Sequence, residues 1–221
     1  MNSLKVKKSF IFDIIVYVMF ILLSIFTYLQ VGEGIHLMLI LNMTLAFVPL
    51  GVIYLAEVIK TRRAWVMVLG IIWFFFYPNS LYLITDLIYL DSNNYMQSLG
   101  VYQGLLYLQN TEAYLALFHL VVAVIIGIMI AIRSFKYFYL IILEQFPKYK
   151  YLFLIFVPIF ASTGIYIGRF LRYNSWDVLN FYQLLINFFG SLSWFSLIFI
   201  LIFTLIQYLI YSYIPINKEV S

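Results

Sequence analysis

Apolar residues gather in six long segments along this chain, separated by short polar stretches. A helix needs about 20 consecutive apolar residues to cross the hydrocarbon of a bilayer, and each segment reaches that length. No stretch between them is long enough to form a core of its own. The pattern therefore predicts an all-α fold, a polytopic membrane helix bundle that forms a single domain over residues 1–221. The six predicted transmembrane spans are residues 10–31, 36–59, 64–86, 113–132, 151–172 and 190–213.

The composition supports a membrane location and excludes several chemistries. The chain is 65% hydrophobic and only 10% charged, far from the usual values of soluble domains. It contains no cysteine, which excludes disulfides, thiolate nucleophiles and Cys-ligated metals. The net charge of +4 comes from basic residues at the ends of spans, so we expect no nucleic-acid partner. We also expect no cofactor.

Positive charge indicates the orientation, because basic residues favour the cytoplasmic side of a membrane. Of the 13 lysines and arginines, eleven fall on one side of the predicted spans, so both termini should be cytoplasmic. The opposite side carries acidic residues and two exceptions to the rule, Arg169 and Arg172. The eleven are Lys5, Lys7, Lys8, Lys60, Arg62, Arg63, Arg133, Lys136, Lys148, Lys150 and Lys218.

Two connecting segments have the composition of interfacial helices. The stretch "RSFKYFYLIILEQFPK" has basic ends and an apolar middle, which predicts an amphipathic helix near 133–146 that ends at Pro147. A simple connector is the alternative. The stretch "SWDVLNFYQLLINFF" predicts a second interfacial helix near 175–188. Its start carries the spacing of a capping box, with Asn174 followed three residues later by Asp177.

The third span is interrupted by polar residues in "FFFYPNSLYLITDLIYL", residues 74–90. From the start of this span at Ala64 to Tyr77 there are only 14 residues, which form about 21 Å of helix. The hydrocarbon is roughly 30 Å thick, so Pro78 falls within it. If the helix continues beyond it, Asn79, Tyr82 and Asp86 stand at i, i+3 and i+7 on one face. The alternative is that Asn79 satisfies the kinked backbone and Asp86 is solvated.

A second polar cluster, "GRFLRYNSWD", ends the fifth span on the same predicted outer side. Arg169 and Arg172 are spaced i and i+3, which places them on one helix face. We expect one of them to pair with Asp86, because a carboxylate in the membrane needs a partner. The alternative is that both arginines extend to headgroup phosphates as simple anchors.

Both stretches resemble the paired signatures of a bacterial multi-pass membrane family known only as the domain of unknown function thirteen sixty-one. The resemblance extends from about residue 40 to residue 215, implies a bacterial plasma-membrane location and implies no particular reaction. By this resemblance the motif positions are Pro78, Asn79, Tyr82, Thr85, Asp86, Gly168, Arg169, Arg172, Asn174, Ser175, Trp176 and Asp177.

The two histidines, His36 and His119, also fall toward the predicted outer side. With Asp86 they have the donor types of a metal site, but their spacing does not require one and we expect no bound metal. His119 fits a hydrogen-bonded residue of helix packing. Asp86 and His119 are the catalytic candidates, since either acts as a general base where it reaches a bound group. Whether the protein is an enzyme stays open.

These residues lead to three hypotheses about function. In the first, a site at the outer leaflet binds an anionic lipid or lipid-linked headgroup, as in cell-envelope lipid modification. In the second, the protein is a non-catalytic subunit that binds a membrane-protein partner, and the polar cluster is a structural lock. In the third, it is a small proton- or ion-coupled transporter. The predicted ligand-binding residues are Asn79, Tyr82, Asp86, Arg169, Arg172, Asn174 and Asp177.

Overall fold

Within the part of the chain that the structure describes, six helical segments are long enough and apolar enough to cross a membrane. The computed structural model describes residues 3–59, 63–91, 94–98 and 104–212. All six predicted spans correspond to these segments, which confirms an all-α, multi-pass membrane protein. The observed segments are Phe10–Val31, Ile35–Ile59, Arg63–Tyr89, Thr111–Ile141, Pro147–Phe170 and Trp194–Ser212.

The orientation of the termini stays a prediction. Three of the basic residues on which it depends, Lys60, Arg62 and Lys218, lie outside the described residues.

The chain divides into two compact units, and each is described by itself. Unit 1 consists of Met1–Thr44 and Leu83–Gly127, and unit 2 consists of Leu45–Tyr82 and Ile128–Ser221. Two helices, α2 and α5, contribute to both. The elements in chain order are α1 (Ser3–Val31), α2 (Ile35–Ile59), α3 (Arg63–Phe76), α4 (Pro78–Tyr82), η1 (Leu83–Tyr89), β1 (Met96–Ser98), β2 (Leu105–Tyr107), α5 (Thr111–Gln145), η3 (Pro147–Tyr149), α6 (Lys150–Phe170), η4 (Ser175–Asn180), α7 (Phe181–Gly190) and α8 (Trp194–Ser212).

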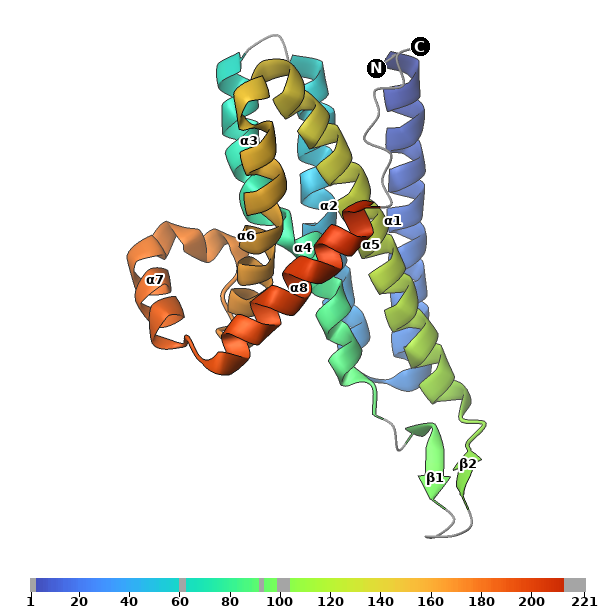
Figure 1. Ribbon diagram of the computed structural model, residues 1–221. Coiled ribbons are helices and arrows are strands. Elements are labelled where there is room, and N and C mark those ends of the chain that lie inside the picture. Colours follow the sequence, from blue (N-terminus) through green and yellow to red (C-terminus); the bar gives the residue numbers. More distant parts are fainter. Residues whose placement is uncertain (1–2, 60–62, 92–93, 99–103, 213–221) are drawn as a thin grey trace. The chain divides into compact units, whose positions relative to one another are not determined.

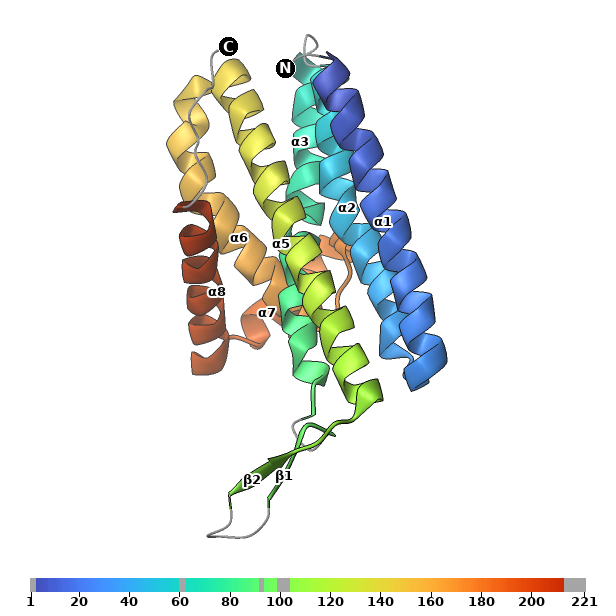
Figure 2. The ribbon, with the colours of Figure 1, turned by 90° about the vertical axis from the view of Figure 1, so that its right-hand side faces the viewer.

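Unit 1 contains α1, the first part of α2, η1 and the first half of α5. A tight turn joins α1 to α2, and these two helices run antiparallel (Figure 2). Gly32 forms this turn with a φ of 78°, a conformation that glycine adopts without steric cost. Its amide donates to the carbonyl of Tyr28 at 2.8 Å, so the last turn of α1 is closed.

A short β-hairpin in unit 1 was not predicted. Strands β1 and β2 pair antiparallel, with Gln97 opposite Leu106, and extend beyond the start of α5 (Figure 2). Every residue of both strands is exposed. Because the hairpin has no buried face, its sequence does not alternate between apolar and polar residues. This alternation is the pattern from which a strand is predicted.

Unit 2 has an aromatic core centred on Trp73, whose side chain is fully buried. Its ring stacks on Tyr77 and Phe138, each at 4.5 Å between centroids, and on Phe153 at 5.6 Å. The indole N–H donates to Ser134 Oγ at 2.6 Å. One side chain thus joins α3, α5 and α6, and its polar atom is satisfied, as the bilayer interior requires.

The predicted interfacial helix near 133–146 is not a separate element. Helix α5 continues without a break from Thr111 to Gln145, and no proline or glycine occurs between 128 and 145 to interrupt it. Phe135, Phe138 and Tyr139 are buried. The aromatic residues that suggested an amphipathic surface helix instead face the core of unit 2.

The second predicted helix, near 175–188, is present as η4 followed by α7. In Figure 1 these elements form a short helical excursion between α6 and α8. Many of their apolar side chains are exposed, including Trp176, Tyr182 and Phe189. The location of η4 and α7 at the membrane interface stays a prediction.

Helices α6 and α8 are joined by a buried polar contact. Gln207 Nε2 donates to the carbonyl of Pro158 at 3.0 Å and to Ser162 Oγ at 2.7 Å. Thr204 Oγ1 donates to the same Ser162 oxygen at 3.1 Å. Lipid offers these groups no alternative partner, so the contact favours helix association.

Candidate functional site

The break in the third span is located at Pro78, as predicted. Helix α3 ends at Phe76 and α4 begins with the proline, whose missing N–H costs nothing at the first position of a helix. Ser80 Oγ donates to the carbonyl of Ala46 at 3.0 Å, which anchors α4 to α2 within unit 2. From Leu83 the chain tightens into the 3₁₀ segment η1.

Asn79 has two roles at this break. Its Nδ2 donates to the carbonyl of Phe76 at 3.0 Å, so it does satisfy the interrupted backbone. The same amide donates to Ser175 Oγ at 2.8 Å. Ser175 belongs to the second polar motif, which means that the two motifs meet directly within unit 2.

Glycines allow α4 to lie very close to α6. A Cβ on Gly164 would be 3.0 Å from Pro78 Cγ, and a Cβ on Gly168 would be 3.2 Å from a ring carbon of Tyr82. Only glycine leaves room for this approach without displacement. The proline and the tyrosine of the first motif therefore pack directly on the backbone of the second.

Arg169 lies over the aromatic face of Tyr82. Its guanidinium carbon is 4.4 Å from the ring centroid, within the range of a favourable cation–π contact. Both side chains are partly buried. The contact brings together two predicted site residues from different spans.

Arg172 is not on the same helix face as Arg169, contrary to the prediction. Helix α6 ends at Phe170, where the Leu171 amide donates to the carbonyl of Ile167 at 3.0 Å. Arg172 then takes a φ of 59° and is exposed. Helical spacing does not apply beyond the last helical residue, so the i, i+3 relation fails.

The capping box at the start of η4 is confirmed. The Asn174 backbone amide donates to Asp177 Oδ2 at 2.6 Å, as a capping box requires, and the Asp177 backbone amide also donates to the backbone carbonyl of Asn174 at 3.0 Å. These bonds satisfy the amides at the beginning of the segment. Asn174 and Asp177 thus have a structural role that fixes Ser175 next to Asn79.

Asp86 belongs to unit 1, where it is fully buried. Its Oδ2 accepts a hydrogen bond from Asn42 Nδ2 at 3.1 Å, so the interpretation of a solvated carboxylate is wrong. The condition for the predicted shared face with Asn79 and Tyr82 is not met, because the α-helix ends at Tyr82 and a 3₁₀ segment follows. Pairing of Asp86 with an arginine stays a prediction.

Sequence analysis missed Asn42 as a partner of Asp86. It is a lone amide within the apolar α2 span, and such a residue in a membrane helix is a signal of an interhelical contact. His119 is confirmed as a hydrogen-bonded packing residue. It is buried, and its Nε2 lies 2.8 Å from Ser24 Oγ. No group of three or more metal-binding side chains occurs within the described part of the chain.

The comparisons with known proteins concern this same region. No curated protein and no solved structure matches the chain. Residues 41–210 match a family described as "Protein of unknown function (DUF1361)". This range includes both polar motifs and most of the chain. The protein therefore belongs to the DUF1361 family, and with its six apolar helices it is an integral membrane protein of that family.

Proposed function

We propose that the arginine site of unit 2 binds the anionic headgroup of a membrane lipid or of a lipid-linked compound in the outer leaflet. We define the arginine site as Asn79, Tyr82, Arg169, Arg172 and Ser175. The observation that carries the proposal is the Arg169 guanidinium on the face of Tyr82, at 4.4 Å, near a second arginine that is exposed.

The cation–π contact suits phosphate recognition. A guanidinium stacks through its face, whereas its N–H donors lie in its plane. Stacking on Tyr82 therefore fixes the orientation of the guanidinium plane and does not occupy its N–H groups. Two of these N–H groups match the spacing of two phosphate oxygens. The Asn79–Ser175 hydrogen bond adds rigidity, because it holds α4 against the segment that follows Arg172.

The backbone of Arg172 gives independent support. A positive φ is rare for residues other than glycine and costs roughly 1 kcal/mol or more. Glycine would adopt the same turn without strain. An arginine in this place is consistent with a need for its charge, and an exposed guanidinium at the end of a span is available to headgroups.

Removal of the two guanidinium groups should abolish selective lipid retention. We expect Arg169→Gln and Arg172→Gln each to weaken binding of phosphatidylglycerol by about tenfold, since a charge-assisted hydrogen bond contributes roughly 1.5 kcal/mol or more. Native mass spectrometry of protein exchanged between phosphatidylglycerol and phosphatidylcholine measures this selectivity. Lys148→Gln removes an exposed charge of unit 2 elsewhere and is the matched control. Equal retention by all variants would reject the proposal.

The second candidate function is a non-catalytic subunit in which these contacts act as a structural lock. It is favoured by the fact that Asn79 and Ser175 bond to each other. A double-mutant cycle with Tyr82→Leu and Arg169→Gln tests it. The lock predicts a coupling of about 0.5–1 kcal/mol in the free energy of unfolding. Coupling in stability together with unchanged lipid selectivity would favour the lock over the lipid site.

A further inference from the structure

A buried chain of hydrogen bonds in unit 1 ends at a nitrogen that has no partner. Ser24 Oγ donates to the carbonyl of Phe20 at 2.8 Å and lies 2.8 Å from His119 Nε2. His119 Nδ1 in turn lies 2.9 Å from His36 Nδ1. The last atom, His36 Nε2, has no hydrogen-bond partner among the residues that the structure describes, and the His36 side chain is fully buried.

The hydrogen-bond directions assign the tautomers of both rings. Because the Ser24 hydroxyl gives its proton to the Phe20 carbonyl, its oxygen accepts from His119 Nε2–H. A neutral imidazole has one donor and one acceptor, so His119 Nδ1 accepts from His36 Nδ1–H. His36 Nε2 is therefore an unprotonated nitrogen with its lone pair unused. A hydrogen bond from the other ring nitrogen makes such an atom more basic.

The pair is buried, and the sequence around it carries acidic but no basic residues. Phe20 stacks on His119 with 5.2 Å between ring centroids, and His119 is also buried. No lysine or arginine occurs in residues 9–44 or 83–127, the parts of the sequence that belong to unit 1 beyond its first residues. The acidic residues in these ranges are Asp13, Glu33, Asp86, Asp91 and Glu112.

Glu33 is the carboxylate whose charge acts on His36. It lies in the turn between α1 and α2, three residues before the histidine, and is exposed. From α1 the pair meets Phe20 and Ser24, which carry no charge. A proton taken up by the pair would therefore be attracted by the Glu33 carboxylate, against the cost of burying the charge.

We propose that the His36–His119 pair is a buried base, with His36 Nε2 as the atom that accepts the proton. A donor X–H transfers its proton to Nε2, the X–H bond breaks and its electron pair stays on X. His36 then carries both N–H groups and the positive charge. It passes the Nδ1 proton to His119 Nδ1, so the charge can occupy either ring. Transfer stops there, since the Ser24 oxygen already donates to the Phe20 carbonyl.

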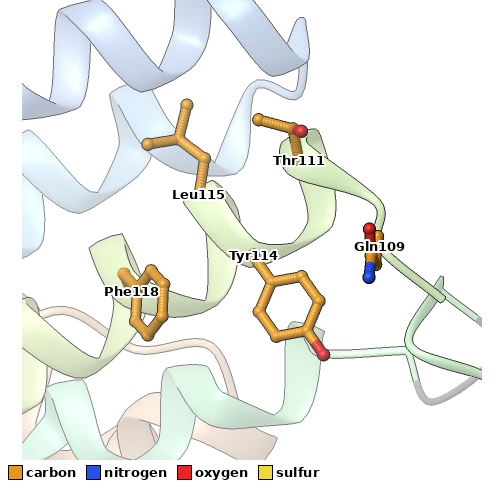
Figure 3. A pocket seen from close by; sticks show the side chains of 5 residues that line it. All are labelled: Gln109, Thr111, Tyr114, Leu115 and Phe118. Carbon is orange, nitrogen blue, oxygen red and sulfur yellow. The ribbon is translucent and has the colours of Figure 1, made fainter. Parts of the chain in front are cut away.

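A hollow of about 460 Å³ lies in unit 1 at the start of α5. Figure 3 shows its lining, which includes Tyr114, Leu115 and Phe118. Leu115 precedes His119 by four residues and so lies on the same helix face, one turn away. The donor is an O–H group in either of two forms, the hydroxyl of a bound ligand or water itself.

Nitrogen-15 spectra of histidine-labelled protein in lipid nanodiscs test the proposal without any substitution. At pH 8 we expect His36 Nδ1 to be protonated and Nε2 unprotonated. Between about pH 8 and pH 4 the pair should take up one proton and not two, because two charged rings whose Nδ1 atoms lie 2.9 Å apart repel each other. Nanodiscs of phosphatidylglycerol and of phosphatidylmethanol, which has the same charge but no free hydroxyl, distinguish the sources. A shift of the Nε2 resonance specific to phosphatidylglycerol identifies a ligand hydroxyl, and equal protonation in both lipids identifies water.

Ser24→Ala provides the matched variant. It removes the acceptor that fixes the His119 tautomer, so the neutral pair should show a mixture of both His36 tautomers. Thr27→Ala is the control, because Thr27 is buried on the same helix but donates to the carbonyl of Leu23. The proposal is overturned if His36 Nε2 carries the proton in the neutral wild-type pair. It is also overturned if Nε2 stays unprotonated over the whole pH range in both lipids.

Discussion

Trp73→Ala should lower the free energy of unfolding by about 3 kcal/mol, the low end of the range for such truncations in cores. We expect the low end because the side chain of an unfolded membrane protein is surrounded by lipid or detergent and not by water. The lost free energy then comes mainly from lost packing contacts. Three stacked rings would lose their common neighbour. Ser134 Oγ would also lose the hydrogen bond from the indole N–H.

The matched control for this prediction is Trp65→Ala. Trp65 is on the same helix α3, but 53% of its surface is exposed and it belongs to no buried cluster. Unfolding in mixed micelles with increasing sodium dodecyl sulfate, followed by circular dichroism, compares the two variants directly. We expect Trp65→Ala to stay within about 0.5 kcal/mol of the wild type. Equal losses for the two tryptophans would contradict the described core.

Gly164→Leu should separate α4 from α6 and destabilise unit 2 by roughly 1–3 kcal/mol. Even the Cβ would lie 3.0 Å from Pro78 Cγ, and the further carbons of leucine have no room beside the proline ring. Displacement of α4 moves Asn79 and Tyr82 away from their contacts with Ser175 and Arg169. The variant should therefore also lose the lipid selectivity that we propose for the arginine site.

Gly51→Leu is the control for Gly164→Leu. Gly51 is on α2 within the same unit and would meet no atom within 4 Å of an added Cβ. Because leucine is a better helix former than glycine, this control should keep or slightly raise the stability. The measurement is the same detergent unfolding, with lipid retention by native mass spectrometry on the folded fraction. A Gly164→Leu protein as stable as Gly51→Leu would contradict the close approach of α4 to α6.

The spans, the break at Pro78 and the capping box were readable from the sequence because each depends on local rules. The length of hydrocarbon requires about 20 apolar residues, proline removes a backbone hydrogen bond and clashes with the preceding turn of a helix, and a capping box needs residues three apart. These requirements hold before any tertiary contact forms. The helical start at Asn174 and the end of α3 near Pro78 therefore agree with expectation.

The same local rules failed where a helix ended or continued against expectation. The spacing of Arg169 and Arg172 predicted one face, but α6 ended between them. The charges around 133–146 predicted a separate helix, but burial of Phe135 and Phe138 in the core of unit 2 keeps α5 continuous. Periodicity describes a helix only as long as packing allows the helix to persist.

The hydrogen-bond partners of the polar residues could not be predicted from the sequence, for a physical reason. Any polar residue in a membrane helix needs a hydrogen-bond partner, which composition alone indicates. Which partner it finds depends on the rotation and packing of helices far apart in the chain. Asn79 meets Ser175 across 96 positions, and Ser24 meets His119 across 95. Hydropathy thus specified a six-span membrane protein with two polar motifs, whereas helix packing selected the contacts that those motifs and the buried histidines make.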